Sequence, residues 1–590
     1  MVAITLDPLT RVNGSLRVSV ELKDGYVSDS WCSGTSYRGL EQMLIGKDPM
    51  DAVYYTQRAC GMCSIPHAIA SVSTIENLCD ASGSVPGAAL VVRNILNGLS
   101  WLRNHIEHLY LCFLPDLADP MYKEMLKTSD VGNKLWVEFN KRFAMPGQGV
   151  TIGEAYLEAV RCIKLISQAE AILGGRSPHT PAIVPGGVTC RPTGSDIYNL
   201  KECYRGIMDF LQSRLPGPVS IEEWLRNTHD RDGDSEYIWN YVRNITLNDF
   251  SASSGWGDMQ LFFTFCSRMV SRDYLSAPAG LDLDTIGGYS LYDQIIGFLS
   301  YGSFYKVRDA GGNIKDGYVP LDRENANSYV LQAGFTPGSM QNIYAAAEKI
   351  DTNLIVEHVH GSFYDYSESR TSRAPLNGET IPFTDPAGIN YNGSKYSFVK
   401  APRYGDVPCE AGPMARMINT REKLILDVMR TLHDSNSRVQ KDRTYPMTGV
   451  YTRVLSRMQE TLVVARMLEE WIYNDLEADV SKYCIPLEIK PRKTGAGLIE
   501  APRGALGHWM RLDSYGKIAG YQIISPTTWN ASPRGAKQKY GPMELALLGA
   551  RTTPLGNIPG SETNPTSIYH IARSFDPCMN CAVHTIRNGR

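Results

Sequence analysis

Two Cys-x-x-Cys pairs, one near each end of this 590-residue chain, constrain its fold more than any other feature. Cys60 and Cys63 form the first pair, in RACGMCSIPH, and Cys578 and Cys581 form the second, in DPCMNCAVH. The pairs can act together only if the fold brings the two ends of the chain to one place. Four convergent thiolates suit structural zinc, an iron–sulfur cluster or a soft transition metal such as nickel. The motifs therefore predict a metal site.

The composition excludes several classes of protein. Hydrophobic residues make up 43% and charged residues 21% of the chain, as in ordinary globular proteins. A formal charge of −3 gives no electrostatic footprint for nucleic acid. Nine single cysteines outside the pairs argue against a disulfide-stapled secreted domain. We expect no signal peptide and no transmembrane helix, so any membrane contact would come through a partner.

Hydrophobic periodicity predicts helices joined to short strands. Residues 15–30 alternate between apolar and polar positions and predict a hairpin that turns at Asp24-Gly25. Helical spacing predicts a bundle, and its segments are about 64–75, 91–113, 154–173, 415–432 and 450–473. Residues 516–524 predict a strand near the end of the chain.

The chain shows no internal repeat and no Pro/Ser-rich linker, so we predict a single unit over residues 1–590. Within it we expect an N-terminal hairpin region, a helical core, a mixed α/β insert and a C-terminal active-site segment. Their expected bounds are 1–50, about 60–175 with 412–475, about 217–410, and 495–590.

The residues around both pairs resemble the signature motifs of the [NiFe] hydrogenase large subunit. Further blocks resemble that family in the same order: LDPLTRVNG (6–14), SGTSYRGLE (33–41), GGRSPHTPAIVPGGVT (174–189), YSFVKAPRY (396–404), EAGPMAR (410–416), EAPRGALGHW (500–509) and ISPTTWNASPR (524–534). The region around 220–350 carries little of this resemblance. The family implies a mainly α, α+β fold with a central helical bundle and small peripheral antiparallel β-sheets.

The resemblance implies reversible heterolytic cleavage of H2, with H2 oxidation as the expected direction. The cofactor would be a nickel–iron centre whose iron carries CO and two cyanide ligands. Cys60 and Cys578 would be terminal nickel ligands, while Cys63 and Cys581 would bridge nickel and iron. Soft thiolates suit both metals.

The resemblance also implies the groups around the centre. Arg503 would lie over the metals and either hydrogen-bond a cyanide or accept the proton. Asp116 and Asp576 match the acidic positions around that arginine. Pro526 and Thr527 match the segment that lines the cyanides.

A second set of residues would tune or tie down the site. His67 would hydrogen-bond a bridging thiolate. Glu41 and His584 would bind a Mg²⁺ (or Fe²⁺) ion that ties the C-terminus into the core. Simpler interpretations stay open: His67 could be a satisfied core histidine, and Asp116 could merely pair with a helix partner.

The sequence departs from the family at two places. Asn13 stands where the family has the glutamate that passes the proton toward solvent, and an amide does not titrate. Glu500, or a path through Arg503 and Asp116, would then take the proton. Only residues 585–590 follow the motif histidine, so the tail is either a brief cleavable extension or is retained on maturation.

No paired cysteines are left to relay electrons. The resemblance therefore implies an obligate heterodimer, or a higher oligomer, with a small subunit that alone carries iron–sulfur clusters. Because that family's export signal sits on the small subunit, cytoplasmic, membrane-associated and periplasmic locations all stay open. The alternative functions are an H2 sensor, a metal-free relative similar to a complex I subunit, and a zinc-stapled structural protein. The four cysteines with Arg503 argue against the metal-free relative.

Overall fold

The computed structural model describes residues 2–119, 130–145, 152–230, 256–270, 287–289, 294–319, 329–338, 343, 345–367, 371–383, 389–435, 448–477, 481–550, 552 and 565–582. His584 and the tail 585–590 lie outside these residues. Among the described helices, none combines the length and the apolar composition needed to cross a membrane.

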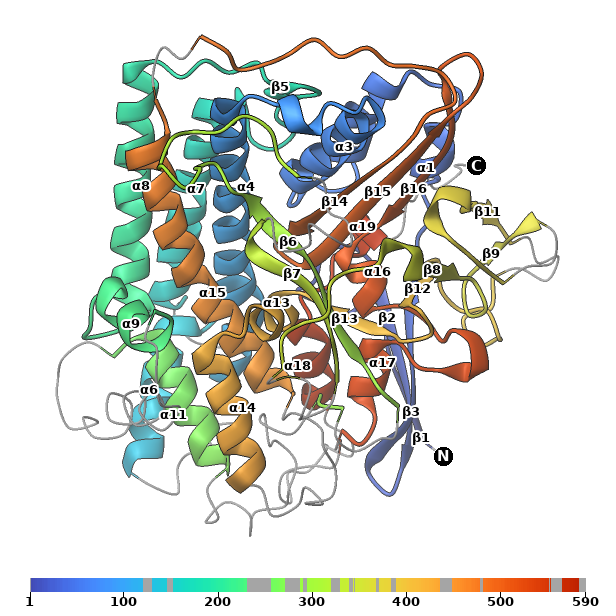
Figure 1. The fold of residues 1–590 in the computed structure, drawn as a ribbon. Helices are drawn as coiled ribbons and strands as arrows, with labels where there is room; N and C mark the ends of the chain where they lie inside the picture. The colour runs from blue at the N-terminus through green and yellow to red at the C-terminus, as the bar shows by residue number, and fades with distance from the viewer. Residues whose placement is uncertain are drawn as a thin grey trace.

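Four long helices stand side by side and form the bundle (Figure 1). They are α4 (Gly87–Glu107), α7 (Glu154–Gly174), α8 (Gly194–Arg214) and α15 (Val450–Glu470). Helix α4 packs against both α7 and α15, and nearly all of its residues are buried. It has to be apolar on most sides because it lies inside the bundle.

Shorter helices surround the bundle and carry the site. They are α1 (Leu40–Met43), α2 (Ala52–Gln57), α3 (Ser64–Leu78), α6 (Asp130–Phe143), α9 (Ile221–Thr228), α11 (Asp258–Val270), α13 (Pro413–Thr420), α14 (Lys423–Ser435), α16 (Pro526–Asn530), α17 (Pro542–Leu547), α18 (Thr566–Ser574) and α19 (Met579–Ala582). Two π-helices, His108–Phe113 and Trp471–Asp475, continue α4 and α15.

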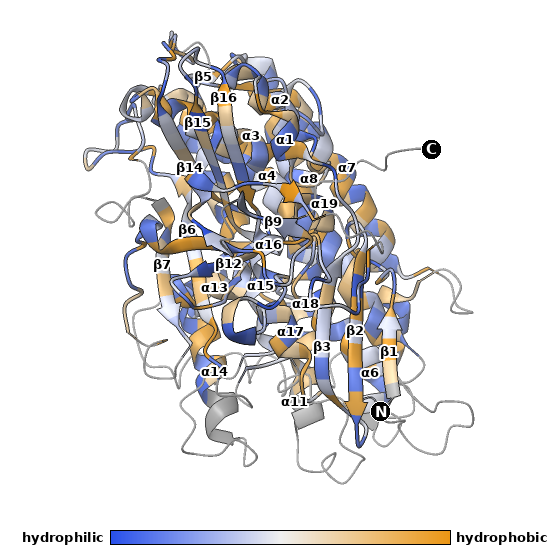
Figure 2. Cartoon of the chain, turned by 90° about the vertical axis from the view of Figure 1, so that its right-hand side faces the viewer, coloured by the Kyte–Doolittle hydropathy of each residue, from blue (hydrophilic) through white to orange (hydrophobic). Residues whose placement is uncertain are grey.

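The described strands form small sheets. Strands β1 (Val2–Leu6), β2 (Leu16–Lys23) and β3 (Tyr26–Gly34) lie side by side at one side of the molecule (Figure 2). Strands β14 (Thr494–Ala501), β15 (Gly504–Leu512) and β16 (Ile518–Ile524) form an antiparallel meander whose β14 packs on α3. The others are β4 (Ile183–Val184), β5 (Gly187–Val188), β6 (Gly297–Tyr305), β7 (Tyr329–Pro337), β8 (Ile355–His358), β9 (Tyr364–Asp365), β10 (Ser372–Arg373), β11 (Ile381–Pro382), β12 (Ala401–Tyr404) and β13 (Cys409–Ala411), which pairs in parallel with β6.

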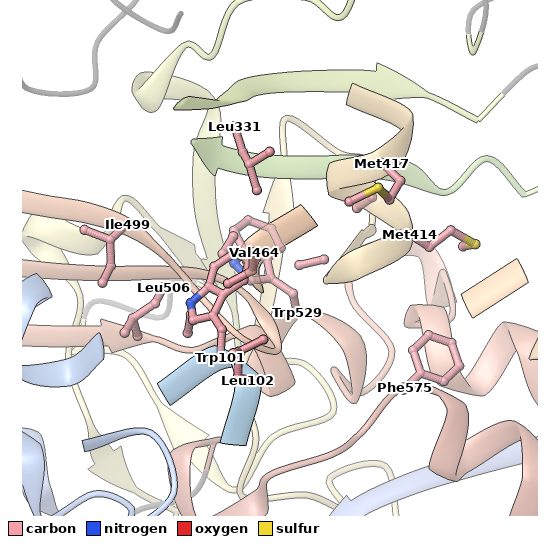
Figure 3. Close-up of a cluster of buried hydrophobic side chains, with 14 of the residues drawn as sticks. Trp101, Leu102, Leu331, Met414, Met417, Val464, Ile499, Leu506, Trp529 and Phe575 are labelled. Atoms are coloured by element: carbon pink, nitrogen blue, oxygen red, sulfur yellow. The ribbon is translucent and has the colours of Figure 1, made fainter. Parts of the chain in front are cut away.

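Two tryptophans mark the core between bundle and meander. Figure 3 shows Trp101 of α4 next to Trp529 of α16, with Ile499 of β14 and Leu506 of β15 beside them. Both indoles are fully buried. The guanidinium carbon of Arg416 lies 4.2 Å from the centre of the Trp101 ring, so a buried cation sits directly on this apolar cluster.

The predicted fold class is confirmed: helices dominate, and the sheets are small and mostly antiparallel. The hairpin at Asp24-Gly25 is confirmed by the pairing of β2 with β3. The helix expected over 415–432 is instead two helices, because Arg421 adopts a left-handed φ of 62° between them. The helix expected over 91–113 changes to a π-helix at His108. Helix α8 and strands β14 and β15 were not predicted.

Candidate metal centre

The fold brings the four cysteines of the two pairs together. Cys60 and Cys63 lie between α2 and α3, and Cys578 and Cys581 lie at α19. One ligand atom from each of the four falls within 4.8 Å of the others, and all four side chains are buried. The Cys63 and Cys581 sulfurs are 2.8 Å apart, and the Cys578 and Cys60 sulfurs are 3.4 Å apart. All four are free cysteines, so the cluster is a ligand set rather than a disulfide pair.

The electrostatics of the cluster suit a multivalent cation. Hydrogen bonds from Cys578 and the other thiols, with the charge of Arg503, lower the pKa of Cys60. Burial raises the pKa of Cys581 well above its ordinary value. Four buried thiolates cannot all ionise at this spacing without a compensating positive charge. The donor set therefore fits a soft metal site, which only deprotonated cysteines can hold.

Arg103 of α4 fixes the loop of the first pair. Its Nη2 donates to the carbonyl oxygens of Gly61 and Met62 at 3.1 and 2.9 Å, while its Nη1 bonds Glu170 of α7 at 3.1 Å. The arginine is nearly fully buried. Two helices of the bundle thus set the position of the residues between Cys60 and Cys63.

The second pair is held by the N-terminal segment and by α16. The backbone of Asn13 forms a parallel bridge with Cys578, and its carbonyl oxygen accepts from the Met579 N–H at 2.7 Å. The Cys578 N–H donates to the Thr527 hydroxyl oxygen at 2.9 Å. Thr527 follows Pro526 in the first turn of α16, which Ser525 caps. Asn13 and Thr527, which are far from each other in sequence, therefore both contact the backbone of Cys578.

Arg503 lies at the tip of the β14–β15 hairpin. The register pairs Ala501 with Gly504, so Pro502 and Arg503 form a two-residue turn. The Arg503 Nε lies 3.0 Å from the Asp576 carbonyl oxygen and 3.1 Å from its carboxylate. With its amide oxygen facing Arg503, Asn104 accepts from Nη2 at 2.8 Å.

The charge of Arg503 is coupled to its surroundings. Burial alone would lower the pKa of Arg503, but Asp576 and the cysteines outweigh it and raise the pKa above its ordinary range. The guanidinium therefore stays charged beside the cysteines. Asp576 in turn lies 3.2 Å from the Nη1 of Arg457.

A buried chain of hydrogen bonds continues from Arg457 to Glu500. Arg457 Nη1 lies 2.9 Å from Nδ1 of His105, whose Nε2 lies 2.9 Å from Glu460. Because an arginine can only donate, Nδ1 of His105 accepts and Nε2 donates. Arg416 bonds both oxygens of Glu460, at 2.7 and 2.6 Å, and one oxygen of Glu500 at 2.6 Å.

Arg416 and Glu500 also hold the backbone before Arg503. Arg416 donates to the carbonyl oxygens of Ala501 and Pro502 at 3.0 and 2.8 Å. The other oxygen of Glu500 accepts from the Tyr301 N–H at 2.7 Å. Glu500 is fully buried, and burial raises its pKa to about 7. This arrangement sets the position of the hairpin tip.

Asp116 pairs with two arginines other than Arg503. Both of its carboxylate oxygens accept from Arg573 Nη1, at 2.9 and 2.7 Å, and Arg11 also bonds it. Burial alone would raise the pKa of Asp116, but His570 and the two arginines lower it. The structure therefore pairs Asp116 with an arginine of α18 and one of the N-terminal segment, whereas Arg503 pairs with Asp576.

His67 begins a hydrogen-bonded series of rings behind the first pair. Its Nδ1 lies 3.0 Å from Nε2 of His508, and Nδ1 of His508 lies 2.8 Å from the hydroxyl of Tyr521. All three side chains are buried. Sequence reasoning did not single out His508, although it lies in the EAPRGALGHW block.

Glu41 lies in a second buried polar site. It accepts from the Ile523 N–H at 2.8 Å and bonds Thr380. Lys400 Nζ lies 3.7 Å from Glu41 and 3.6 Å from Glu357. Neither oxygen of the fully buried Glu357 has a hydrogen-bond partner in the described chain. His584 lies outside the described residues, so its expected place beside Glu41 stays a prediction.

A family model described as nickel-dependent hydrogenase matches residues 38–135, 123–220 and 295–584. The chain belongs to the nickel-dependent hydrogenase family. The family fixes the activity of the chain, which is the catalytic large subunit of a [NiFe]-type hydrogenase, an oxidoreductase that acts on H2. Its cofactor is a nickel–iron centre.

Individual relatives agree with this assignment over nearly the whole chain. The periplasmic [NiFeSe] hydrogenase large subunit of Desulfomicrobium baculatum is 29% identical over 601 residues, which cover 99% of this chain and 95% of that protein. The uptake hydrogenase large subunit of Rhodobacter capsulatus is 26% identical over 642 residues, with coverage of 99% and 95%. The crystal structure of the reduced, active Ni-Fe-Se hydrogenase from D. baculatum superposes with a TM-score of 0.70 at 27% identity, covering 99% of this chain and 100% of that one. Since these relatives are large subunits, the hydrogenase has a small-subunit partner.

Several site residues were missed by sequence reasoning, chiefly Arg103, Asn104, His105, Arg457 and Glu460. All are buried, and all lie on α4 or α15. One signal was present in the sequence: polar residues interrupt the apolar stretches of both predicted helices. Fully buried charges occur in proteins only when they are paired, so such interruptions indicate a polar network inside the bundle.

Proposed function

We propose that Cys60, Cys63, Cys578 and Cys581 hold a nickel–iron centre whose iron carries CO and two cyanide ligands. Cys60 and Cys578 are the terminal nickel ligands, and Cys63 and Cys581 bridge the two metals. When bound, the centre polarises H2 for heterolytic cleavage. The convergence of the four buried thiols within 4.8 Å carries the proposal. The 2.8 Å separation of the Cys63 and Cys581 sulfurs supports their bridging role.

Arg503 is the catalytic side chain of the protein next to this centre. Asp576 engages its Nε, so the guanidinium is oriented and its terminal nitrogens are left for Asn104 and for the ligands of iron. Asp576 holds the guanidinium in position and favours its charged form. Pro526 and Thr527 line the cyanides, a role that the bond between Thr527 and the Cys578 backbone supports.

His67 and Glu500 support the centre from behind. Because His508 occupies Nδ1 of His67, Nε2 is the nitrogen that bonds a bridging thiolate. Glu500 holds Arg416, whose guanidinium bonds the two carbonyl groups before Arg503. Asp116, through Arg573 and Arg11, fixes α18 against the N-terminal segment.

Glu41 and His584 bind a Mg²⁺ or Fe²⁺ ion near the C-terminus. The buried, unsatisfied oxygens of Glu357 support a cation in this region, because a hydrated ion would supply the missing donors. The Lys400 Nζ lies 3.7 Å from Glu41 and 3.6 Å from Glu357, which is too far for a hydrogen bond to either carboxylate. Chelation should release this ion without removing nickel.

Electrons from H2 leave through an iron–sulfur small subunit in an obligate heterodimer. Within the described residues, the four cysteines are the one cluster of three or more potential metal ligands, so this chain offers no second redox site there. The direction is H2 oxidation, as the name of the R. capsulatus uptake enzyme suggests. Any contact with a membrane is made by the partner.

Metal analysis and infrared spectroscopy of the heterodimer test the proposal. We expect nickel, iron in excess of nickel because the clusters of the small subunit also contain iron, and bands from CO and cyanide. We expect loss of nickel when any of the four cysteines is changed to Ser. Cys162→Ala is the matched control, because Cys162 is equally buried but lies on α7. Zinc alone in the purified protein, or unchanged nickel in the four variants, would overturn the proposal.

A further inference from the structure

Cleavage of H2 releases a proton inside the protein, and a titratable group has to pass it to solvent. Besides Glu170 and Glu460, which pair with Arg103 and Arg416, four carboxylates of the described residues lie in the charged region around the cysteines: Asp116, Asp576, Glu500 and Glu107. The backbone of Asn13 pairs with Cys578, but its side-chain amide does not titrate and cannot carry the proton. Which carboxylate is free to bind and release a proton therefore decides the route.

Three of the four carboxylates are held by cations. Asp576 lies between Arg503 and Arg457, at 3.1 and 3.2 Å. Asp116 is bonded by two arginines through both of its oxygens. Glu500 has both oxygens engaged and no exposed surface. Protonation of any of them would break a buried ion pair, which is strongly destabilising.

Glu107 differs from these three in both respects. Its carboxylate makes no hydrogen bond or ion pair with any residue that the structure describes, and its side chain is half-buried rather than enclosed. It is the last residue of α4, and the π-helix His108–Phe113 follows it directly. A π-helical turn of this kind is frequent at functional sites.

The charged groups that act on Glu107 come from each element of the site. They are Arg503 of the β14–β15 turn, Asp576 before the second pair, Arg103 of α4 and Cys60 of the first pair. Burial raises the pKa of Cys112 in the π-helix, and the charges of Asp576, Glu107 and Arg503 also act on this pKa. The charges of the site therefore act on the Glu107 carboxylate, while part of the side chain is exposed to solvent.

We propose that Glu107 carries the proton from the metal centre to solvent, an inference that rests on the proposed function. The proton released when the H–H bond breaks forms an O–H bond with the carboxylate, and that O–H bond breaks when the proton passes to water, which restores the carboxylate. No electron changes place in this step. Burial raises the pKa of Glu107, and Arg503 limits that rise. A relay group works best when its pKa lies near the working pH.

The test separates H2 cleavage from proton exit in the heterodimer. Conversion of para-H2 to ortho-H2 needs only cleavage and recombination, whereas formation of HD from D2 in H2O needs exchange with solvent. We expect Glu107→Gln to slow HD formation about 100-fold, the lower end of the range for loss of an acid–base group, and to leave para-H2 conversion and nickel content unchanged. Glu107→Asp should restore most of the exchange.

An infrared difference spectrum gives a readout other than activity: the C=O band of a protonated carboxyl should disappear in Glu107→Gln. Glu202→Gln is the control, because Glu202 is a similarly exposed helical glutamate that pairs with Arg205 on α8. Exchange at the wild-type rate in Glu107→Gln would overturn the inference, and so would equal loss of para-H2 conversion and exchange. A nickel- and iron-loaded wild-type enzyme that does neither would overturn the proposed function itself.

Discussion

Arg503 and Asp576 hold each other at two points, since the Arg503 Nε contacts both the carbonyl oxygen and the carboxylate of Asp576 at 3.0 and 3.1 Å. Asp576 lies two residues before Cys578 and has a left-handed φ of 52°. The hairpin tip of β14–β15 is thereby joined to the second cysteine pair. The position of Arg503 and the position of the second cysteine pair are consequently set by the same contact.

Asp576→Asn should destabilise the protein strongly. The change leaves Arg503 and Arg457 buried without their shared anion, and breaking a buried pair in this way costs about 3–5 kcal/mol. We expect a lower urea midpoint and less nickel per chain. The control is Asp80→Asn, which removes an exposed pair with Lys493 that solvent screens, so it contributes little to stability. Equal urea midpoints for the two variants would contradict the argument.

Glu460 should make stability depend on pH in the acid range. Burial alone would raise the pKa of Glu460, but Arg416 outweighs it and lowers the pKa to about 2. An unfolded glutamate titrates near about 4.3. Since the folded pKa is the lower one, the contribution of Glu460 is complete above about pH 4.3 and is lost as the pH falls toward 2.

The measurement compares the urea midpoints of the wild type and Glu460→Gln between pH 7 and pH 3. We expect the variant to be less stable at pH 7 and to lose less stability on acidification. Parallel decreases in the two proteins would show that Glu460 does not titrate in this way.

The sequence predicted the convergence of the two cysteine pairs because both motifs are local and chemically specific. It also predicted α3, α4, α7 and α15, since their apolar positions repeat every three or four residues over long stretches. Arg503 could be placed near the metals only through the resemblance. Nothing in its local sequence shows that Pro502 and Arg503 form the tip of a hairpin.

The partners of the acidic residues could not be predicted. The position of Asp116 around Arg503 stays a prediction of the resemblance, whereas its pairing with Arg573 and Arg11 was not predicted. The choice among several arginines is made by the packing of α18 and the N-terminal segment, which no spacing in the sequence encodes. Glu107 was not singled out for the same reason: its lack of a partner among the described residues becomes visible only when its neighbours are placed.

Arg416→Lys should disturb the hairpin tip while leaving the metals bound. The guanidinium bonds Glu460, Glu500 and two carbonyl groups from fixed directions, and a lysine has three donors on a single atom. We expect H2 oxidation to fall about 10-fold or more, as misplacement of a catalytic group predicts. The infrared bands of cyanide should shift, because Arg503 moves relative to them. Unchanged bands together with unchanged turnover would remove Arg416 as a positioning residue.

Gly14→Ala should weaken the attachment of the second cysteine pair. Gly14 has a φ of +79°, and a Cβ there would lie 2.8 Å from the Asn580 side-chain oxygen and 3.0 Å from the Asn580 nitrogen. The added methyl group would push apart the bridge between Asn13 and Cys578. Gly46→Ala is a matched control, since Gly46 has a φ of +78° and a Cβ there would meet nothing within 4 Å. Both variants carry the backbone cost of about 1–2 kcal/mol, but only Gly14→Ala should lose nickel as well. Nickel retained by Gly14→Ala, or lost equally by both variants, would show that this bridge does not position the ligands.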